Sequence, residues 1–185
     1  MEILLGSKSP RRKQLLQAME YDFSVVNIDC DEDFGSIEAH KVAEYLAIKK
    51  SKAYDKLEED QLLITSDTTV VVGKEVLNKP SNKREAFEMI SKLSGRQHKV
   101  ISGVALRSKD KLISFSEVTE VHFKALSEEE INHYIDLYKP FDKAGAYGIQ
   151  EWIGIVGITG INGCYYNVMG LPCARLNQTL KAEFS

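Results

Sequence analysis

Residues 6–12 combine hydroxyl and basic side chains in an order that suits an anion. They follow a short apolar run, residues 2–5, which is typical of a strand, and they lead into a helix. A helix N-terminus offers free backbone N–H groups and positive potential, and Ser7, Arg11 and Arg12 add donors suited to phosphate oxygens. The sequence therefore predicts a phosphate-binding loop. The alternative is a serine cap on a helix with a solvated basic first turn, and these residues alone leave it open.

Asp67 lies among the polar residues 65–69, between the apolar runs 62–64 and 70–72. A carboxylate at the end of a buried strand can bind a divalent cation or deprotonate water, and α/β folds place ligands beside strand ends. We therefore expect one strand to end before Asp67 and another to begin after it. A turn aspartate satisfied by local backbone N–H groups would give the same pattern, so both interpretations stay open.

A glycine-rich segment, residues 142–150, ends in Gln150. Small residues let the backbone approach a ligand closely, and a glutamine amide can both donate and accept hydrogen bonds. Such an amide can pair with the N3–H and O4 edge of uracil or thymine. A glycine-rich turn at a sheet edge explains the segment equally well. Lys79, in an Asn-Lys-Pro turn, has the pattern of an ordinary exposed lysine.

The composition excludes several classes of protein. The chain has 185 residues, of which 43% are hydrophobic and 28% charged, and this rules out disorder as the main state. Its 24 Lys and Arg against 27 Asp and Glu give a net charge of -3, which argues against a binder of nucleic acid polymers. No apolar stretch approaches the roughly 20 residues of a membrane span, and the N-terminus lacks an export signal, so we expect a cytoplasmic protein.

Common cofactor and metal patterns are absent, but the charges are unevenly placed. Cys30, Cys164 and Cys173 are odd in number and lack zinc-site spacing, so we expect reduced packing residues. Neither a Walker A loop nor a Gly-x-Gly-x-x-Gly loop between strand and helix occurs. Residues 3–19 contain no acid, whereas four acids crowd into residues 29–33. Such opposite clusters are consistent with solvated loops or with the two halves of a site for an anion and its metal.

Hydrophobic periodicity predicts alternating strands and helices that position these segments. Strands are expected at residues 2–5, 23–28, 62–65, 68–72, 99–107 and 112–126, with the last two joined as a hairpin. Helices are expected after Pro10, over residues 39–53, from Ser81 or Asn82 to Gly95, from a capping box at Ser127 to Pro140, and after Pro172. The glycines of residues 145–170 match neither period, so we expect bulged strands there and a tight hairpin turn at residues 162–163.

Together these segments resemble the Maf family of nucleoside triphosphate pyrophosphatases. The resemblance covers essentially the whole chain and is carried by residues 7–12, 66–68, 78–80, 94–98, 142–150 and 170–172. Residues 142–150 resemble the branch that acts on dTTP and UTP. The resemblance implies hydrolysis between the α and β phosphates, releasing a monophosphate and pyrophosphate, with a divalent cation, Mg²⁺ or Mn²⁺. It also implies a single two-lobed α/β domain over residues 1–185, with an elongated mixed sheet flanked by helices, a central cleft and usually a homodimer.

The same resemblance implies roles for individual residues. Asp67 matches the family's proposed proton acceptor, and Asp67 with Glu32 would hold the metal. Ser7 belongs to the phosphate-binding loop, and the positions that contact phosphate are Arg11, Arg12, Lys50 and Lys79. The positions linked to substrate choice are Arg11, Thr68 and Gln150. The chain departs from the common pattern at Gly6, at residues 65–66, and at Lys139 and Phe141.

Two other functions are compatible with a basic loop. A nucleotide- or RNA-responsive regulator of cell division would bind phosphates without turning them over. A phosphatase would remove the terminal phosphate instead. The regulator differs from the pyrophosphatase at Asp67, because catalysis needs a carboxylate there and anion binding alone would be weakened by it.

Overall fold

The computed structural model describes residues 1–184 and divides the chain into two compact units. Unit 1 comprises residues 1–68, 102–117 and the chain from Gly170 onward, and unit 2 comprises residues 69–101 and 118–169. The strands form a seven-stranded sheet in the order β2-β1-β3-β5-β6-β7, with β4 paired to β3. Parallel and antiparallel pairs both occur in it, which confirms the predicted mixed sheet.

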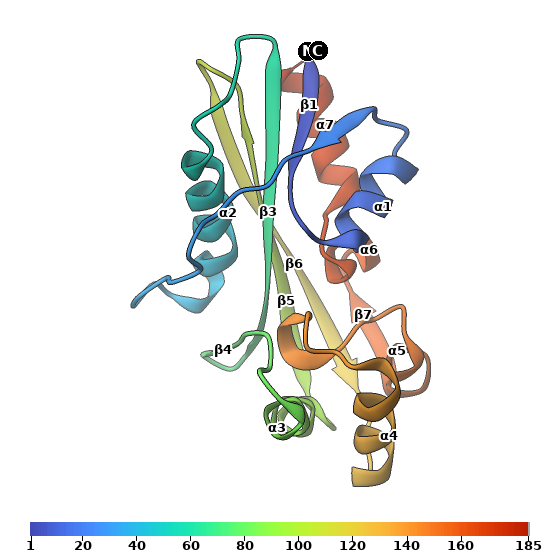
Figure 1. The fold of residues 1–185 in the computed structure, drawn as a ribbon. Helices are drawn as coiled ribbons and strands as arrows, with labels where there is room; N and C mark the ends of the chain where they lie inside the picture. Colours follow the sequence, from blue (N-terminus) through green and yellow to red (C-terminus); the bar gives the residue numbers. More distant parts are fainter. Residues whose placement is uncertain (185) are drawn as a thin grey trace. The chain divides into compact units, whose positions relative to one another are not determined.

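Unit 1 contains the N-terminal strands and three long helices. β1 (Glu2–Gly6) pairs in parallel with β2 (Phe23–Val25) and with β3 (Gln61–Val72). α2 (Val42–Ala53), which follows the short 3-10 helix η1 (Ala39–Lys41), packs on one side of β3, while α1 (Pro10–Ala18) and α7 (Cys173–Glu183) lie on the other side (Figure 1). These helices bury their apolar faces, for example Leu15 and Leu16 of α1 and Leu176 and Leu180 of α7.

The prediction of two strands around Asp67 was wrong. β3 is one strand of 12 residues, and Asp67 lies within it rather than at an end. Nine of these residues are buried, including Thr65, Ser66, Asp67 and Thr69, so the polar run does not interrupt the strand. The pairing with β1 ends at Thr65 and the pairing with β4 (Glu75–Leu77) begins at Val70. Residues 66–69 therefore lie between these two partners of β3.

Small residues let α2 approach the sheet closely. Ala43 and Ala47 are fully buried on the helix face that meets the strands. Gly103 of β5 (Gln97–Arg107) faces them, and a Cβ atom added there would lie 2.3 Å from the carbonyl carbon of Ala43. β5 continues into β6 (Leu112–Phe123) through four residues closed by a 2.9 Å bond from Ser108 N to Lys111 O. This short link confirms the predicted hairpin, because parallel neighbours need a long crossover.

Unit 2 is built around an apolar core to which α3 (Lys83–Leu93) and α4 (Glu128–Tyr138) contribute. The helix signals in the sequence were confirmed here. Asn82 caps α3, Gly95 after it has a φ of +68°, and Ser127 with Glu130 forms the capping box of α4. The remaining elements of this unit are η2 (Ala144–Ala146), α5 (Trp152–Gly157), β7 (Ile158–Asn162) and α6 (Tyr165–Met169).

The prediction of bulged strands and a hairpin turn in the glycine-rich region was only partly right. β7 is a strand with an irregular register against β6, but two short helices, α5 and α6, flank it. Residues 162–163 lead into α6 and not into a second strand, so they do not form a hairpin turn. None of the helices in the described part of the chain has the length and hydropathy of a membrane span.

We expect Gly103→Ala to destabilise the protein by about 3 kcal/mol, because the added methyl group meets backbone atoms of α2 that cannot move independently. The free energy of unfolding in urea measures this effect. Gly160→Ala in β7 is the matched control, since its Cβ would come no closer than 3.7 Å to any neighbour. Equal stability of the two variants would contradict the close contact between β5 and α2.

Candidate phosphate and cation site

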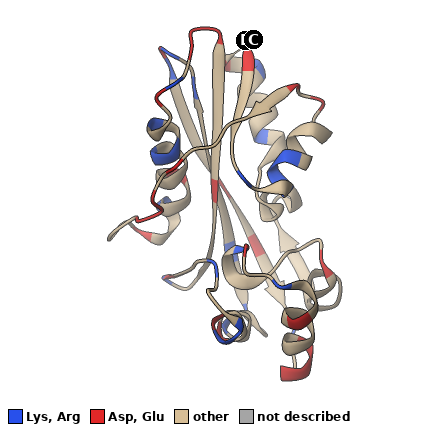
Figure 2. Ribbon diagram, viewed as in Figure 1, with Lys and Arg blue, Asp and Glu red and all other residues tan. Residues whose placement is uncertain are grey.

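Asp67 is a buried carboxylate held by an ion pair. Asp67 is 8% exposed, and its Oδ1 lies 2.5 Å from the Nζ of Lys50 on α2. Thr65, two residues earlier and therefore on the same side of β3, donates a 2.7 Å hydrogen bond to the carbonyl oxygen of Ala47. Both contacts fix the register of α2 against β3. Asp67 is the acidic residue of β3, and Figure 2 shows acidic colour part-way along that strand.

Glu32 meets the same ammonium group. Its Oε1 lies 2.9 Å from Lys50 Nζ, so one cation stands between the carboxylates of Glu32 and Asp67. The neighbouring Lys49 binds Asp31 at 2.5 Å and holds the pKa of that carboxyl group below its usual range. Lys49 and Lys50 of α2 thus bind two neighbouring carboxylates of the acidic loop and hold that loop against the helix.

One oxygen atom of Asp67 and one of Glu32 lie on either side of a single cation, which is the ammonium group of Lys50. Mg²⁺ and Mn²⁺ prefer such hard oxygen ligands, and Mg²⁺ commonly uses one or two carboxylates together with substrate phosphates. No group of three or more His, Cys, Asp or Glu side chains arranged for a metal occurs among residues 1–184. The donor set therefore fits a cation shared with a substrate and does not form a complete protein site.

Arg12 joins three separate segments of unit 1. Its Nε donates to the carbonyl oxygen of Gly170 at 2.9 Å, its Nη1 to Ser7 Oγ at 3.3 Å and its Nη2 to Thr68 Oγ1 at 3.0 Å. These bonds use three of the five N–H donors of a guanidinium group. Burial lowers the pKa of Arg12, while the charge of Asp67 opposes that shift, and the side chain stays protonated.

The helix cap and the buried arginine settle part of the question that the sequence left open. Ser9 does cap α1, since its hydroxyl accepts a 3.4 Å bond from the backbone N–H of Arg12. The first turn is nevertheless not simply solvated, because Arg11 and Arg12 are both partly buried. The positive charge of Arg11 adds to the effect of burial in lowering the pKa of Arg12.

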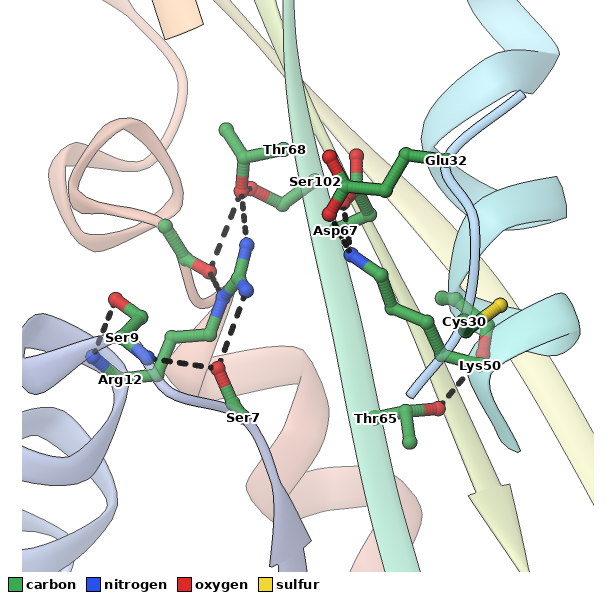
Figure 3. Close-up of polar contacts among 12 residues, drawn as sticks. Ser7, Ser9, Arg12, Cys30, Glu32, Lys50, Thr65, Asp67, Thr68 and Ser102 are labelled. Carbon is green, nitrogen blue, oxygen red and sulfur yellow. Dashed lines mark hydrogen bonds and ion pairs between the residues drawn. The ribbon is translucent and has the colours of Figure 1, made fainter. Parts of the chain in front are cut away.

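Six of the predicted residues form two groups on opposite sides of β3 (Figure 3). Ser7, Arg12 and Thr68 form one group, and Glu32, Lys50 and Asp67 form the other. Side chains of consecutive strand residues point to opposite faces, so Asp67 and Thr68 are one residue apart along the strand and belong to different groups. The arrangement places hydroxyl and guanidinium groups on one side of the strand and two carboxylates that share the Lys50 ammonium group on the other.

Two predicted residues belong to unit 2, and both are exposed: Lys79 and Gln150. Lys79 follows β4, beside the carbonyl oxygen of Asn78 that accepts a 3.2 Å bond from Gly145 N. It also lines a cavity of about 280 Å³ between β4 and α3. Three glutamates and two lysines line the same cavity, so its lining has no excess of positive charge that would favour a triphosphate.

Sequence reasoning assigned no site role to Ser102 or to Gly170, although residues 170–172 are among those that carry the family resemblance. Ser102 of β5 shares a 2.8 Å hydrogen bond with Thr68, and Gly170 supplies the carbonyl oxygen that Arg12 binds. Gly170 has a φ of +120°, which explains the glycine at that position. A serine inside the apolar strand of residues 97–107 was the available signal for Ser102.

Comparison with known proteins gives full-length matches. The family model described as Maf-like protein matches residues 2–183. A dTTP/UTP pyrophosphatase of Parabacteroides distasonis is 49% identical over 97% of this chain and 95% of its own length. A dTTP/UTP pyrophosphatase of Phocaeicola vulgatus is 47% identical with the same coverage. Among solved structures, the similarity to the Staphylococcus aureus Ham1 protein covers 66% of this chain and 72% of that protein, with 17% identity and a TM-score of 0.49.

We expect Arg12→Lys to lower the free energy of unfolding by about 2 kcal/mol, because an ammonium group cannot reach the three acceptors that the guanidinium fork binds. Urea denaturation measures the loss. Arg84→Lys is the matched control, since Arg84 is exposed and makes a single ion pair with Glu88, and we expect no measurable change there. A fully stable Arg12→Lys protein would show that the three contacts contribute nothing.

Proposed function

The chain belongs to the Maf-like protein family, and from that premise we propose that it hydrolyses dTTP and UTP to the monophosphate and pyrophosphate. The observation that carries the proposal is the likeness to relatives named dTTP/UTP pyrophosphatase, which extends over 97% of the chain. The geometry of unit 1 supports it, because Arg12 of α1 and Lys50 of α2 contact Thr68 and the buried Asp67, which are neighbours on β3. We further propose that residues 1–185 act as one domain, because β3, β5 and β6 each pass from one unit into the other.

The proposed mechanism assigns the phosphates to the basic residues. Ser7, Arg11, Arg12, Lys50 and Lys79 would donate to phosphate oxygens, and their charges would oppose the negative charge that grows on the leaving pyrophosphate. Arg12 is suited to this role because its bonds to Ser7, Thr68 and Gly170 hold the guanidinium in place before the substrate arrives. Such fixed donors need no reorganisation during the reaction.

Asp67 would orient the water that attacks the α phosphorus. Its carboxylate is buried and held at 2.5 Å by Lys50, so its position is well defined. When bound, Mg²⁺ or Mn²⁺ would neutralise phosphate charge and lower the pKa of a coordinated water molecule. Asp67 and Glu32 would hold that cation, and Lys50 would then turn from the carboxylates to the phosphates. Because a bound cation weakens a carboxylate as a base, orientation of water is the role we assign to Asp67.

Arg11, Thr68 and Gln150 are proposed to select the base, following the family pattern. Thr68 is held by Arg12 and Ser102, so its hydroxyl has a fixed position. Gln150 exposes an amide that can pair with the O4 and N3–H of uracil or thymine. The homodimer and the cytoplasmic location expected from the sequence stay predictions.

Product analysis tests the reaction. Purified protein incubated with UTP and Mg²⁺ should release UMP and pyrophosphate, and Asp67→Asn should lower turnover by about 10²- to 10⁴-fold through loss of the carboxylate that directs the water. Chromatographic separation of the nucleotides gives both the products and the rate. UDP with phosphate would instead indicate the phosphatase, and unchanged UTP would indicate the regulator.

Asp110→Asn is the matched control for Asp67→Asn, because Asp110 is an exposed residue of the turn between β5 and β6. It makes the same chemical change away from the site. Melting temperatures of both variants separate loss of catalysis from loss of folding. Near-normal turnover by folded Asp67→Asn protein would exclude the assigned role.

Replacement of Lys50 tests whether its ammonium group fills the cation position. We expect Lys50→Met to bind Mn²⁺ about tenfold more tightly than the wild-type protein, because Asp67 and Glu32 would lose the positive charge that neutralises both. Paramagnetic resonance of free Mn²⁺, recorded without nucleotide, measures this affinity independently of activity. Lys49→Met breaks the pair with Asp31 and the 2.9 Å bond to the carbonyl oxygen of Asp33, but it leaves Lys50 in place and should leave the Mn²⁺ affinity unchanged. Identical Mn²⁺ affinity of Lys50→Met and wild type would contradict this interpretation.

A further inference from the structure

Gln150 is presented to solvent by a tight turn of unit 2. The backbone N–H of Glu151 donates a 3.1 Å bond to the carbonyl oxygen of Gly148, which closes residues 148–151 into a β-turn. Ile149 is 5% exposed and anchors the turn in the apolar core, whereas Gln150 beside it is exposed. The position of the Gln150 amide therefore depends on what holds this turn.

One buried hydroxyl group bonds both ends of the turn. Tyr134 of α4 is fully buried, and its hydroxyl accepts a 3.0 Å bond from the backbone N–H of Gly148 and donates to the carboxylate of Glu151. Burial and the neighbouring Glu151 charge raise the pKa of Tyr134 far above its ordinary value, so the hydroxyl keeps the proton that it donates. The capping box at Ser127 fixes the helix that carries Tyr134.

Lys143 holds the same carboxylate from another direction. Its Nζ lies 3.2 Å from Glu151 Oε1 and 2.8 Å from Asp142 Oδ1, and only 10% of its side chain is exposed. Gly148 packs directly against this pair, since a Cβ atom added there would lie 3.0 Å from Glu151 Cδ and 3.1 Å from Lys143 Cε. Tyr134, Lys143 and Glu151 thus form a closed network around the turn.

The position of the turn has a chemical consequence for base selection. Uracil presents O4 and N3–H, and guanine presents the analogous pair O6 and N1–H on a larger ring. A glutamine amide can bond either pair, so its identity alone does not distinguish UTP from GTP. The distance of the amide from the rest of the nucleotide does distinguish them, because the purine edge lies farther from its ribose. Displacement of the turn should therefore reduce the preference for a pyrimidine.

We propose that Tyr134 is a positioning residue for pyrimidine selection, acting with Glu151 and Lys143 through Gln150. The inference depends on the proposed hydrolysis of UTP and dTTP, and it adds a residue that does not touch the substrate. Removal of the Tyr134 hydroxyl breaks its hydrogen bonds to Gly148 and to Glu151 and leaves the aromatic ring in place.

Kinetics with UTP and GTP test the inference. In Tyr134→Phe, the ratio of kcat/KM for UTP to that for GTP should fall about tenfold, because the amide is no longer held at the pyrimidine distance. Tyr138→Phe is the matched control, since Tyr138 stacks on Tyr134 at 5.1 Å but is 39% exposed, and its ratio should not change. A merely structural loss would lower both substrates equally and leave the ratio unchanged, which would overturn the proposal.

Trp152 gives a second readout that needs no turnover. It is the one tryptophan of the chain, it follows Glu151 directly, and its ring contacts His133 with centroids 4.8 Å apart. Quenching of its fluorescence by acrylamide should increase in Tyr134→Phe and stay unchanged in Tyr138→Phe. If Tyr134→Phe does not fold, Glu151→Gln replaces it, and a smaller fall in the same ratio is expected because the pair with Lys143 is lost.

The outcomes separate the inference from the function on which it depends. A wild-type protein that leaves UTP intact would refute the proposed function and the selection role with it. A wild-type protein that prefers UTP, together with folded Tyr134→Phe of unchanged preference, would refute the positioning role alone.

Discussion

Burial of one carboxylate within a strand constrains the whole of unit 1. A charged group taken out of water needs a partner of opposite charge at short range, and Asp67 finds it in Lys50. That contact requires α2 to lie close to β3, which the small residues Ala43, Ala47 and Gly103 permit. Lys50 in turn draws in Glu32, so the acidic loop is held on the same helix. The contacts of Asp67 thus follow from the free-energy cost of burying a carboxylate without a partner of opposite charge.

Unit 2 meets the same constraint with a different set of groups. Lys143 and Glu151 are largely buried, and they pair with each other while Tyr134 supplies a further donor to the carboxylate. In both units the satisfied groups fix a short segment that carries proposed site residues: residues 66–68 in one and the turn 148–151 in the other. Buried polar networks of this kind allow few alternative arrangements, because each displaced group would lose its partner in a medium of low dielectric.

Local signals in the sequence predicted the helices and strands well where neighbours decide the conformation. The caps at Asn82 and Ser127 lie within the residues they cap, so a short window contains all the information. Asp67 was misplaced because aspartate is rare inside strands, and the lysine that makes it tolerable belongs to another element. The spacing of the glycines was misinterpreted for a similar reason. Gly154 is required because a Cβ atom there would lie 1.8 Å from the carbonyl oxygen of Ile149, and the sequence spacing does not reveal this contact. The resemblance supplied the predicted site residues but not the contacts between them.

The pairing explains how a chain with a net charge of -3 can carry a strongly basic loop. The charge of Lys50 is cancelled by two carboxylates, and that of Arg12 is distributed over two hydroxyl groups and a carbonyl oxygen. Neither cation therefore needs a broad basic surface, which would attract long anionic polymers without selection. A short, highly charged anion can bind together with a divalent cation, and it can then compete with Asp67 and Glu32 for the ammonium group of Lys50. The ion pairs of Lys50 are therefore consistent with the proposed triphosphate substrate, which is a compact anion and not an extended polymer.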